Sequence, residues 1–261
     1  MPTALIVEDE PEANQLLAML VQLRGYRTDS AFTGGEALEA AGRSLPDIVF
    51  LDLMLPDING FDVCRALKSS RPTSAIPVVM VTARLAAENR LQGFRAGATE
   101  YVPKPYTPDQ IFGAMARADA WRKRLDEGHH EGSIPLDAAG DLAYLRDINR
   151  LRCLLLARAS LSEAAARRLD QVLLDVAQRA VDWGHRQGVG LVATLHYRWA
   201  PDRLTLTLID ESGWFRADPP AGPGGLAAAI ARGPFDAVAD DPAGGRVVLT
   251  LFIGPFDGTG G

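Results

Sequence analysis

The chain has 261 residues, of which 47% are hydrophobic and 23% are charged, and its formal net charge is −6. This length suggests about two domains, each with its own hydrophobic core. The acidic balance disfavours a dominant nucleic-acid surface. No apolar run approaches the roughly 20 residues of a membrane helix, so we expect no membrane segment. Two cysteines, Cys64 and Cys153, stand far apart in apolar helical patterns, which predicts reduced thiols and a cytoplasmic location.

The first half of the chain alternates short apolar runs with helical patterns as far as about residue 127. The predicted strands are 3–9, 27–32, 47–52, 76–83 and 100–105. The predicted helices are 11–24, 34–44, 60–70, 86–97 and one that starts near 108. Five strand–helix repeats predict an α/β fold, in which a doubly wound parallel sheet of five strands is covered by helices on both faces.

Polar residues stand where the predicted strands end. They are Glu8, Asp9, Asp52, Thr82 and Lys104. Because ligands in open sheets bind beyond the carboxyl ends of the strands, we expect these side chains to converge. Three adjacent carboxylates repel one another unless a cation shares the site, and Mg²⁺ prefers such oxygen ligands. A carboxylate beside Mg²⁺ and a lysine can attack phosphorus.

The individual residues have plainer interpretations. A single aspartate at a strand end is usually a helix cap or a turn residue, and Thr82 alone would be an ordinary hydroxyl. The joint pattern, with the turn sequence PDING behind Asp52, favours a phosphoryl-transfer site over a purely structural origin.

The motifs ED, LDLMLPDING, VMVTAR and YVPKP resemble the receiver domain of two-component response regulators, over about residues 1–125. The resemblance implies a flavodoxin-like fold. It also implies that Asp52 accepts a phosphoryl group from a sensor histidine kinase or a histidine phosphotransfer protein. The Mg²⁺ ligands would be Glu8, Asp9, Asp52 and the backbone carbonyl of Met54.

The same resemblance implies roles for three further residues. Lys104 would pair with the carboxylate or the phosphate, and Thr82 would bond a phosphoryl oxygen. Tyr101 would be the aromatic switch residue, although simple surface packing also fits a tyrosine at this position. Pro105 after Lys104 is expected to be cis. The receiver would catalyse its own phosphorylation and dephosphorylation.

The second half of the chain follows a polar, glycine-containing stretch, residues 126–132, which we expect to be a linker before a second domain at 133–261. A short strand and two long helical patterns come next. The segments GLVATLHYRWA, DRLTLTLIDE and RVVLTLF then alternate in polarity, as antiparallel strands do. These elements predict an α+β fold of two layers. We expect no DNA binding, because a helix-turn-helix pair with a basic recognition helix is missing from the pattern.

This order of elements resembles the ATP-binding fold of the GHKL class, especially the serine-kinase anti-sigma factors of bacteria, over about residues 133–255. The similar segments are LLDVAQRAVDWGH, LIDESGWF and GPGGLAAAI. By this resemblance Asp210 is the candidate adenine-recognising carboxylate, and Gly225 belongs to the glycine-rich lid. Asp175 replaces the glutamate of the family, and Arg179 stands where an Mg²⁺-holding asparagine belongs.

The departures weaken the case for ATP. Arginine has donors only and a fixed positive charge, so Arg179 cannot hold Mg²⁺. Asp175 and Arg179 are four residues apart, which predicts an ion pair on one helix. Trp214 is placed to fill the adenine pocket.

Two hypotheses for the second domain therefore compete. In the first, it is an inactive, nucleotide-free module that binds a downstream protein target under the control of Asp52. In the second, it is an ATP-dependent serine kinase of the anti-sigma type. Arg179 favours the first, unless it faces away from the site. The helix that starts near 108 is a candidate coupler or homodimer surface.

Overall fold

The computed structural model describes residues 1–83, 87–126, 131–139, 142–158, 161–200, 202–217, 225–241 and 245–253. The chain divides into two compact units, Met1–Glu127 and Gly128–Gly261. None of the helices in these described ranges is long and apolar enough to cross a membrane.

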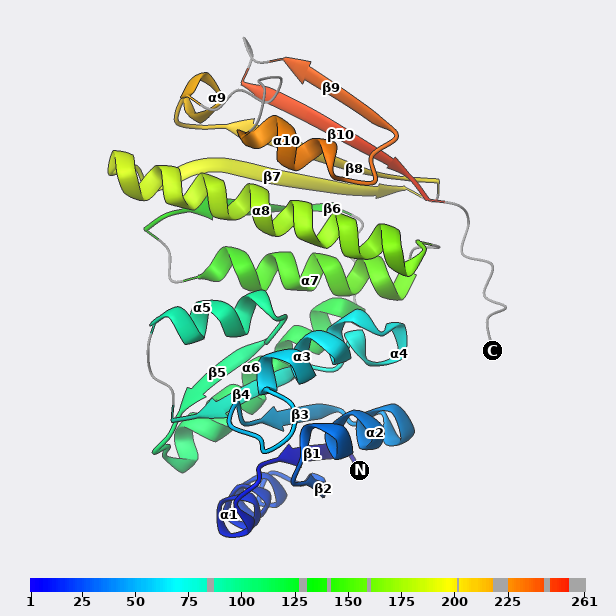
Figure 1. Cartoon of the computed structure of the whole chain (residues 1–261), viewed down its shortest axis with the longest axis vertical. Coiled ribbons are helices and arrows are strands. Elements are labelled where there is room, and N and C mark those ends of the chain that lie inside the picture. The colour runs from blue at the N-terminus through cyan, green and yellow to red at the C-terminus, as the bar shows by residue number, and fades with distance from the viewer. Residues whose placement is uncertain are drawn as a thin grey trace. The chain divides into compact units, whose positions relative to one another are not determined.

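Unit 1 is an α/β structure. Its described part contains a parallel sheet of five strands in the order β2-β1-β3-β4-β5 (Figure 1). The strands are β1 (Thr3–Val7), β2 (Arg27–Ala31), β3 (Ile48–Leu51), β4 (Val78–Thr82) and β5 (Glu100–Pro103). The helices are α1 (Pro11–Gln22), α2 (Gly34–Ser44), α3 (Gly60–Ser69), α4 (Arg71–Ser74), α5 (Ala87–Arg95) and α6 (Pro108–Asp126). The predicted fold of the first domain is confirmed.

Both faces of this sheet are buried, which explains the continuous apolar runs of its central strands. Alternate residues of β1 enter different cores, because successive side chains of a strand point to opposite faces. Leu5 and Val7 pack in the core that α2 and α3 cover. Ala4 and Ile6 pack in the core that α1 and α6 cover. β2 is polar and mostly exposed, as suits a strand at the sheet edge.

Unit 2 has an antiparallel sheet. Within its described part, the strand order is β6-β7-β8-β10-β9, and each pairing is antiparallel. The strands are β6 (Glu131–Asp137), β7 (Leu191–Ala200), β8 (Arg203–Asp210), β9 (Ala237–Asp241) and β10 (Arg246–Phe252). The helices are α7 (Ala143–Arg158), α8 (Glu163–Gln187), α9 (Trp214–Ala217) and α10 (Gly225–Ala231). The predicted antiparallel strands are confirmed.

The sheet of unit 2 alternates buried and partly exposed residues, so helices cover one of its faces. α7 and α8 contact β6, and α8 also contacts β7 and α10. α8 is bounded by two local signals. The hydroxyl of Ser162 accepts a hydrogen bond from the Ala165 N–H at 3.2 Å, and Gly188 ends the helix with a φ of +68°.

Several boundaries differ from the sequence prediction. The expected linker was 126–132, but α6 includes Asp126 and β6 begins at Glu131, so residues 126, 131 and 132 belong to a helix or a strand. Residues 127–130 lie outside the described residues. The short helices α4 and α9 and the edge strand β9 were not predicted. These elements have four or five residues each, which is too short for a periodic pattern to emerge.

Candidate functional site

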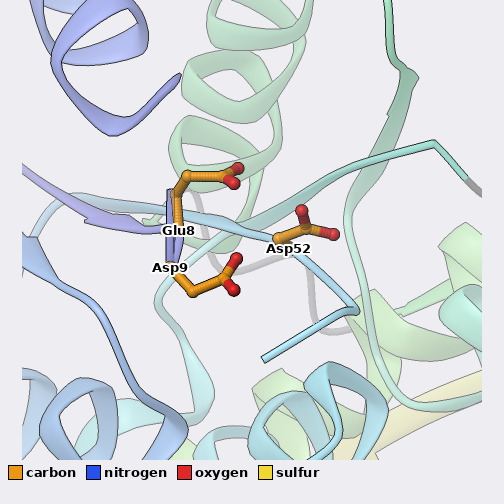
Figure 2. A group of neighbouring side chains, drawn as sticks. All are labelled: Glu8, Asp9 and Asp52. Carbon is orange, nitrogen blue, oxygen red and sulfur yellow. The ribbon is translucent and has the colours of Figure 1, made fainter. Parts of the chain in front are cut away.

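Three acidic residues meet at the carboxyl edge of the parallel sheet. Glu8 and Asp9 follow β1, and Asp52 follows β3, its neighbour in the sheet. Carboxylate oxygens of the three residues lie within 4.8 Å of one another (Figure 2). Glu8 and Asp52 are 3% and 5% exposed, and Asp9 is exposed. The predicted convergence of these three side chains is therefore observed, with Asp9 at the surface of the cluster.

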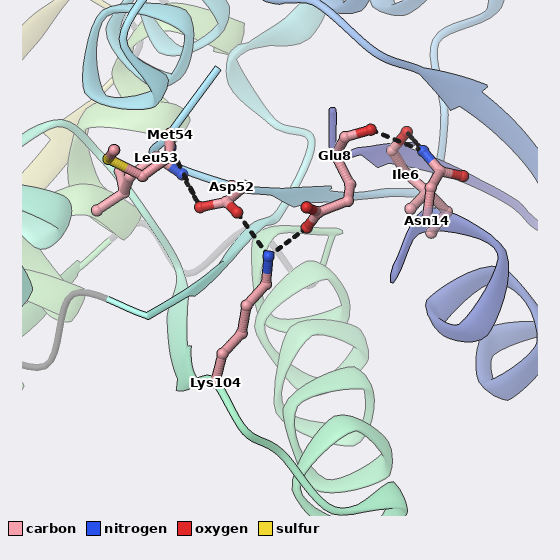
Figure 3. A network of polar contacts seen from close by, with 7 residues as sticks. All are labelled: Ile6, Glu8, Asn14, Asp52, Leu53, Met54 and Lys104. Atoms are coloured by element: carbon pink, nitrogen blue, oxygen red, sulfur yellow. Dashed lines mark hydrogen bonds and ion pairs between the residues drawn. The ribbon is translucent and has the colours of Figure 1, made fainter. Parts of the chain in front are cut away.

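Lys104 places its ammonium group between two of these carboxylates (Figure 3). Its Nζ donates a hydrogen bond to Oδ2 of Asp52 at 2.6 Å, and another to Oε2 of Glu8. Burial favours a lower pKa for Lys104, but the hydrogen bonds to Asp52 and Glu8 raise it above 10.5. Burial raises the pKa of Glu8, and Lys104 opposes this rise. The positive charge thus stabilises a crowded acidic site.

The backbone after β3 holds Asp52 in place. Its Oδ1 accepts hydrogen bonds from the N–H groups of Leu53 at 2.5 Å and Met54 at 3.2 Å. The first residue of α3, Gly60, approaches this backbone closely, because a Cβ there would lie 2.2 Å from the carbonyl oxygen of Asp52. Glycine in the PDING turn therefore permits the contact that positions the site.

Thr82 and Tyr101 lie on the neighbouring strands β4 and β5. Thr82 is fully buried at the end of β4, and its carbonyl accepts a hydrogen bond from the Lys104 N–H at 2.8 Å. The Lys104–Pro105 peptide bond is cis, as predicted. Tyr101 is partly buried and packs against the core beside Met80. The backbones of Thr82 and Lys104 are thus adjacent, while Tyr101 lies further back along β5.

Asn14, which the sequence pattern did not single out, supports the end of β1. Asn14 is 2% exposed, and its Nδ2 donates to the carbonyls of Ile6 at 3.4 Å and Glu8 at 3.3 Å (Figure 3). Its Oδ1 accepts from Ser30 Oγ at 2.7 Å. The available signal was an amide on the buried face of α1, in line with Leu17. A polar residue at such a position needs buried partners.

Asp57 was also missed. Its carboxylate accepts hydrogen bonds from the N–H groups of Gly34 at 2.7 Å and Gly35 at 2.9 Å, at the start of α2. These bonds hold the pKa of Asp57 below its ordinary value. The loop that carries Leu53 and Met54 is thereby tied to α2. Asp57 lies in the PDING turn. Aspartate is common in turns, so the pattern alone does not indicate a further role.

In unit 2, the carboxylate of Asp210 is hydrogen bonded to its own loop. Oδ1 accepts from the N–H groups of Ser212, Gly213 and Trp214 at 3.0, 2.9 and 3.0 Å. Oδ2 accepts from the Phe215 N–H at 3.0 Å. Asp210 therefore caps α9, and both of its oxygens are already bonded to the backbone.

The other residues of the predicted nucleotide site lie on α8 and at the start of α10. Asp175 forms an ion pair with Arg232, just after α10, with 2.6 Å between Oδ2 and the guanidinium. The expected partner of Asp175 was Arg179, and this prediction is wrong because a tertiary partner lies within reach of the carboxylate. Arg179 instead lines a hollow beside the buried Trp214. Gly225 begins α10.

Comparisons with known proteins agree with the geometry of unit 1. The family described as "Response regulator receiver domain" matches residues 4–116. The transcriptional regulatory protein TcrX of Mycobacterium tuberculosis is 39% identical over 109 residues, which are 42% of this chain and 46% of that protein. PhoB of Rhizobium meliloti, a phosphate regulon regulator, is 35% identical over 151 residues, which are 58% and 64% of the two proteins.

Among solved structures, the chemotaxis response regulator CheY4 of Vibrio cholerae is 27% identical, with a TM-score of 0.43. The match covers 45% of this chain and 98% of that one. The chain spans about half the length of the curated relatives it matches. The family match coincides with the parallel sheet and with the cluster of Glu8, Asp9, Asp52 and Lys104. Residues 4–116 of this chain therefore belong to the response regulator receiver domain family.

Proposed function

We propose that the chain is a response regulator of a two-component phosphorelay, with a receiver at residues 1–125 and an output domain at 133–261. Its phosphoacceptor is Asp52. The observation that carries this proposal is the ammonium group of Lys104 between the carboxylates of Asp52 and Glu8. A purely structural role does not explain why the buried carboxylate of Asp52 lies at the sheet edge beside the Lys104 ammonium group and two further acidic residues.

The acidic cluster fits a divalent cation, because its close carboxylate oxygens are hard ligands. Glu8, Asp9, Asp52 and the backbone carbonyl of Met54 would hold Mg²⁺. When bound, the ion supplies positive charge that offsets the charge of an incoming phosphoryl group.

The proposed reaction moves a phosphoryl group from a histidine of the kinase or phosphotransfer protein. The Asp52 carboxylate attacks phosphorus, a P–O bond forms, and the P–N bond to the partner's imidazole breaks. Lys104 neutralises charge on Asp52 and on the phosphoryl oxygens. Attack of water on the acyl phosphate later releases phosphate and restores the carboxylate.

The proposed switch uses Thr82 and Tyr101. Thr82 would bond a phosphoryl oxygen on Asp52, and Tyr101 would move into space that Thr82 leaves. A movement of Thr82 followed by one of Tyr101 is consistent with the full burial of Thr82 and the partial burial of Tyr101. Such a change would remodel the surface around β4 and β5.

A small phosphodonor with Mg²⁺ tests the receiver. Intact mass spectrometry should show one added phosphoryl group on the wild type and none on Asp52→Asn. The control Asp109→Asn changes an exposed aspartate in the first turn of α6 and should be phosphorylated normally. An unmodified wild-type chain would falsify the proposal.

For unit 2 we propose a nucleotide-free output module that resembles the GHKL fold and binds a downstream protein. Two features support this. Both oxygens of Asp210 are occupied by backbone N–H groups, and a guanidinium stands where a metal-holding amide is expected. Titration of ATP with Mg²⁺ by calorimetry tests it. Micromolar affinity would instead favour the ATP-dependent serine kinase.

The downstream target is proposed to be a protein whose binding depends on phosphorylation. Affinity capture with phosphorylated wild type and with Asp52→Asn should recover different proteins. The same proteins in both samples would show that unit 2 does not respond to Asp52.

A further inference from the structure

The C-terminal half of α8 lies near the short helix α9 (Figure 1). Residues of both helices line a hollow on unit 2. Its lining residues are Arg179, Asp182, Trp183, Arg186, Trp214 and Ala217. Two of these residues are arginines and two are tryptophans. Such a composition is unusual for a site expected to hold a metal–nucleotide complex, and it fits an anion.

The two arginines of the hollow have no ion-pair partner among the described residues. Arg179 and Arg186 are seven residues apart on α8, about two helical turns, so both reach the same side of the helix. In the part of the chain that the structure describes, neither guanidinium takes part in an ion pair or a hydrogen bond. Of the acidic neighbours, Asp175 pairs with Arg232. Asp182, which also lines the hollow, accepts a hydrogen bond from the neutral amide of Gln178 at 2.5 Å and keeps its charge, so the two arginines still leave the lining net positive.

The tryptophans give the hollow a firm apolar wall. Trp214 is 1% exposed and packs against Phe215, with ring centroids 5.7 Å apart. Its backbone N–H is fixed by Asp210. Trp183 is partly buried on the other side. Apolar surroundings lower the local dielectric, which strengthens the attraction between a guanidinium and an anion.

We propose that this hollow binds a phosphate monoester group, held by Arg179 and Arg186 without a metal ion. A phosphate monoester carries nearly two negative charges and three acceptor oxygens. Two planar guanidinium groups match this group better than they match a single carboxylate. The inference rests on the proposed nucleotide-free output function, because it gives the partner of unit 2 a chemical feature.

The test uses the full chain with Asp52→Asn and no divalent metal, so that the receiver site does not take up phosphate. Inorganic phosphate and a phosphoserine peptide are titrated separately while tryptophan fluorescence is recorded. Both should give a saturable change through Trp183 and Trp214. If the peptide binds more tightly than inorganic phosphate, the natural ligand is a phosphorylated protein. If the two bind equally, the natural ligand is a small phosphate compound.

Arg179→Gln and Arg186→Gln should each weaken phosphate binding about tenfold or more, since charge-assisted hydrogen bonds are lost. Arg186 is exposed, so its substitution should leave the fold intact. The control Arg246→Gln removes an arginine from a second hollow, on the sheet face, and should bind normally. The proposal is overturned if phosphate causes no saturable change, or if Arg246→Gln alone abolishes it.

Failure of this inference differs from failure of the proposed output function. Absence of phosphate binding, together with absence of ATP binding, removes the anion site and leaves the nucleotide-free module. Tight ATP binding that requires Mg²⁺ removes the nucleotide-free module, and the site would then hold a metal–nucleotide complex.

Discussion

At the residue scale, Lys104 keeps two carboxylates close together by contacting both. Replacing it with methionine preserves the length of the side chain and removes the charge. We expect Lys104→Met to slow phosphorylation of Asp52 by a small phosphodonor about one hundredfold, the cost typical of losing one group that stabilises developing charge. Intact mass measured over time gives the rate.

The matched control is Lys123→Met, which removes an exposed lysine on α6 and should leave the rate unchanged. A normal rate in Lys104→Met would show that the ammonium group only stabilises the folded receiver. Thermal unfolding of the same variant separates the two roles.

A second charged pair is partly buried in unit 2, where Asp170 on α8 pairs with Arg152 on α7. Burial raises the pKa of Asp170 from 3.8 to about 6, against the opposing effect of Arg152. Because the folded state holds this proton more tightly than the unfolded state, the contribution to stability is complete below pH 3.8 and is lost as the pH rises to about 6. The shift corresponds to roughly 3 kcal/mol.

This prediction is measured as the free energy of unfolding of unit 2 in urea between pH 4 and 7. Wild type should lose stability relative to Asp170→Asn as the pH rises. Asp182→Asn changes an exposed carboxylate on the same helix and should follow wild type. A constant difference between wild type and Asp170→Asn would contradict the raised pKa.

The site residues that were predicted correctly from the sequence are those whose positions follow from the sheet topology alone. Glu8, Asp52 and Lys104 converge because parallel strands end at one sheet edge. The partners of Asp175 and Asp210 depend on tertiary packing and on turn conformation. Asp175 finds Arg232 at a distance of 57 residues in sequence, and helical spacing cannot reveal such a contact.

At the scale of elements, Asp57 ties the loop after β3 to the first turn of α2. Gly34 brings the two still closer, because a Cβ there would lie 2.8 Å from Ile58 Cβ. The loop presents the backbone carbonyl of Met54, a proposed ligand. We therefore expect Asp57→Ala to weaken Mg²⁺ affinity about tenfold, as loss of an outer support of a metal site commonly does.

Titration of Mg²⁺ against the fluorescence or the calorimetric heat of the folded protein measures this affinity. Asp62→Ala is the control, since Asp62 is an exposed acidic residue of α3 that pairs with Arg65. An equal loss in both variants would indicate a general effect of negative charge near the site, and the tie to α2 would then have no special role.

Helices and strands could be predicted from the sequence where they are long enough for burial to produce a periodic apolar pattern. α8 has 25 residues, and its stripe of Leu169, Val172 and Val176 is buried. β9 has the sequence AVADD and exists through its pairing with β10. Nothing local in those five residues specifies a strand, so only the edge of a sheet already formed can define it.

At the scale of the whole molecule, each unit has its own sheet and core, so we expect two cooperative unfolding transitions. A ligand that binds only the folded receiver should raise the midpoint of one transition. Mg²⁺ at about one hundred times its Kd adds about 2.7 kcal/mol of stability, which is a shift of roughly 10 °C for a unit of this size.

Differential scanning calorimetry with Mg²⁺, and again after addition of a chelator, measures the two midpoints. The chelator should reverse the shift. Asp9→Asn should abolish the shift, because it removes a proposed Mg²⁺ ligand. Asp9 is exposed, so its substitution leaves the core unchanged. If both midpoints rise, or if the shift persists in Asp9→Asn, the metal binds outside the cluster of Glu8, Asp9 and Asp52. The receiver chemistry would then need a different source of positive charge than the proposed ion.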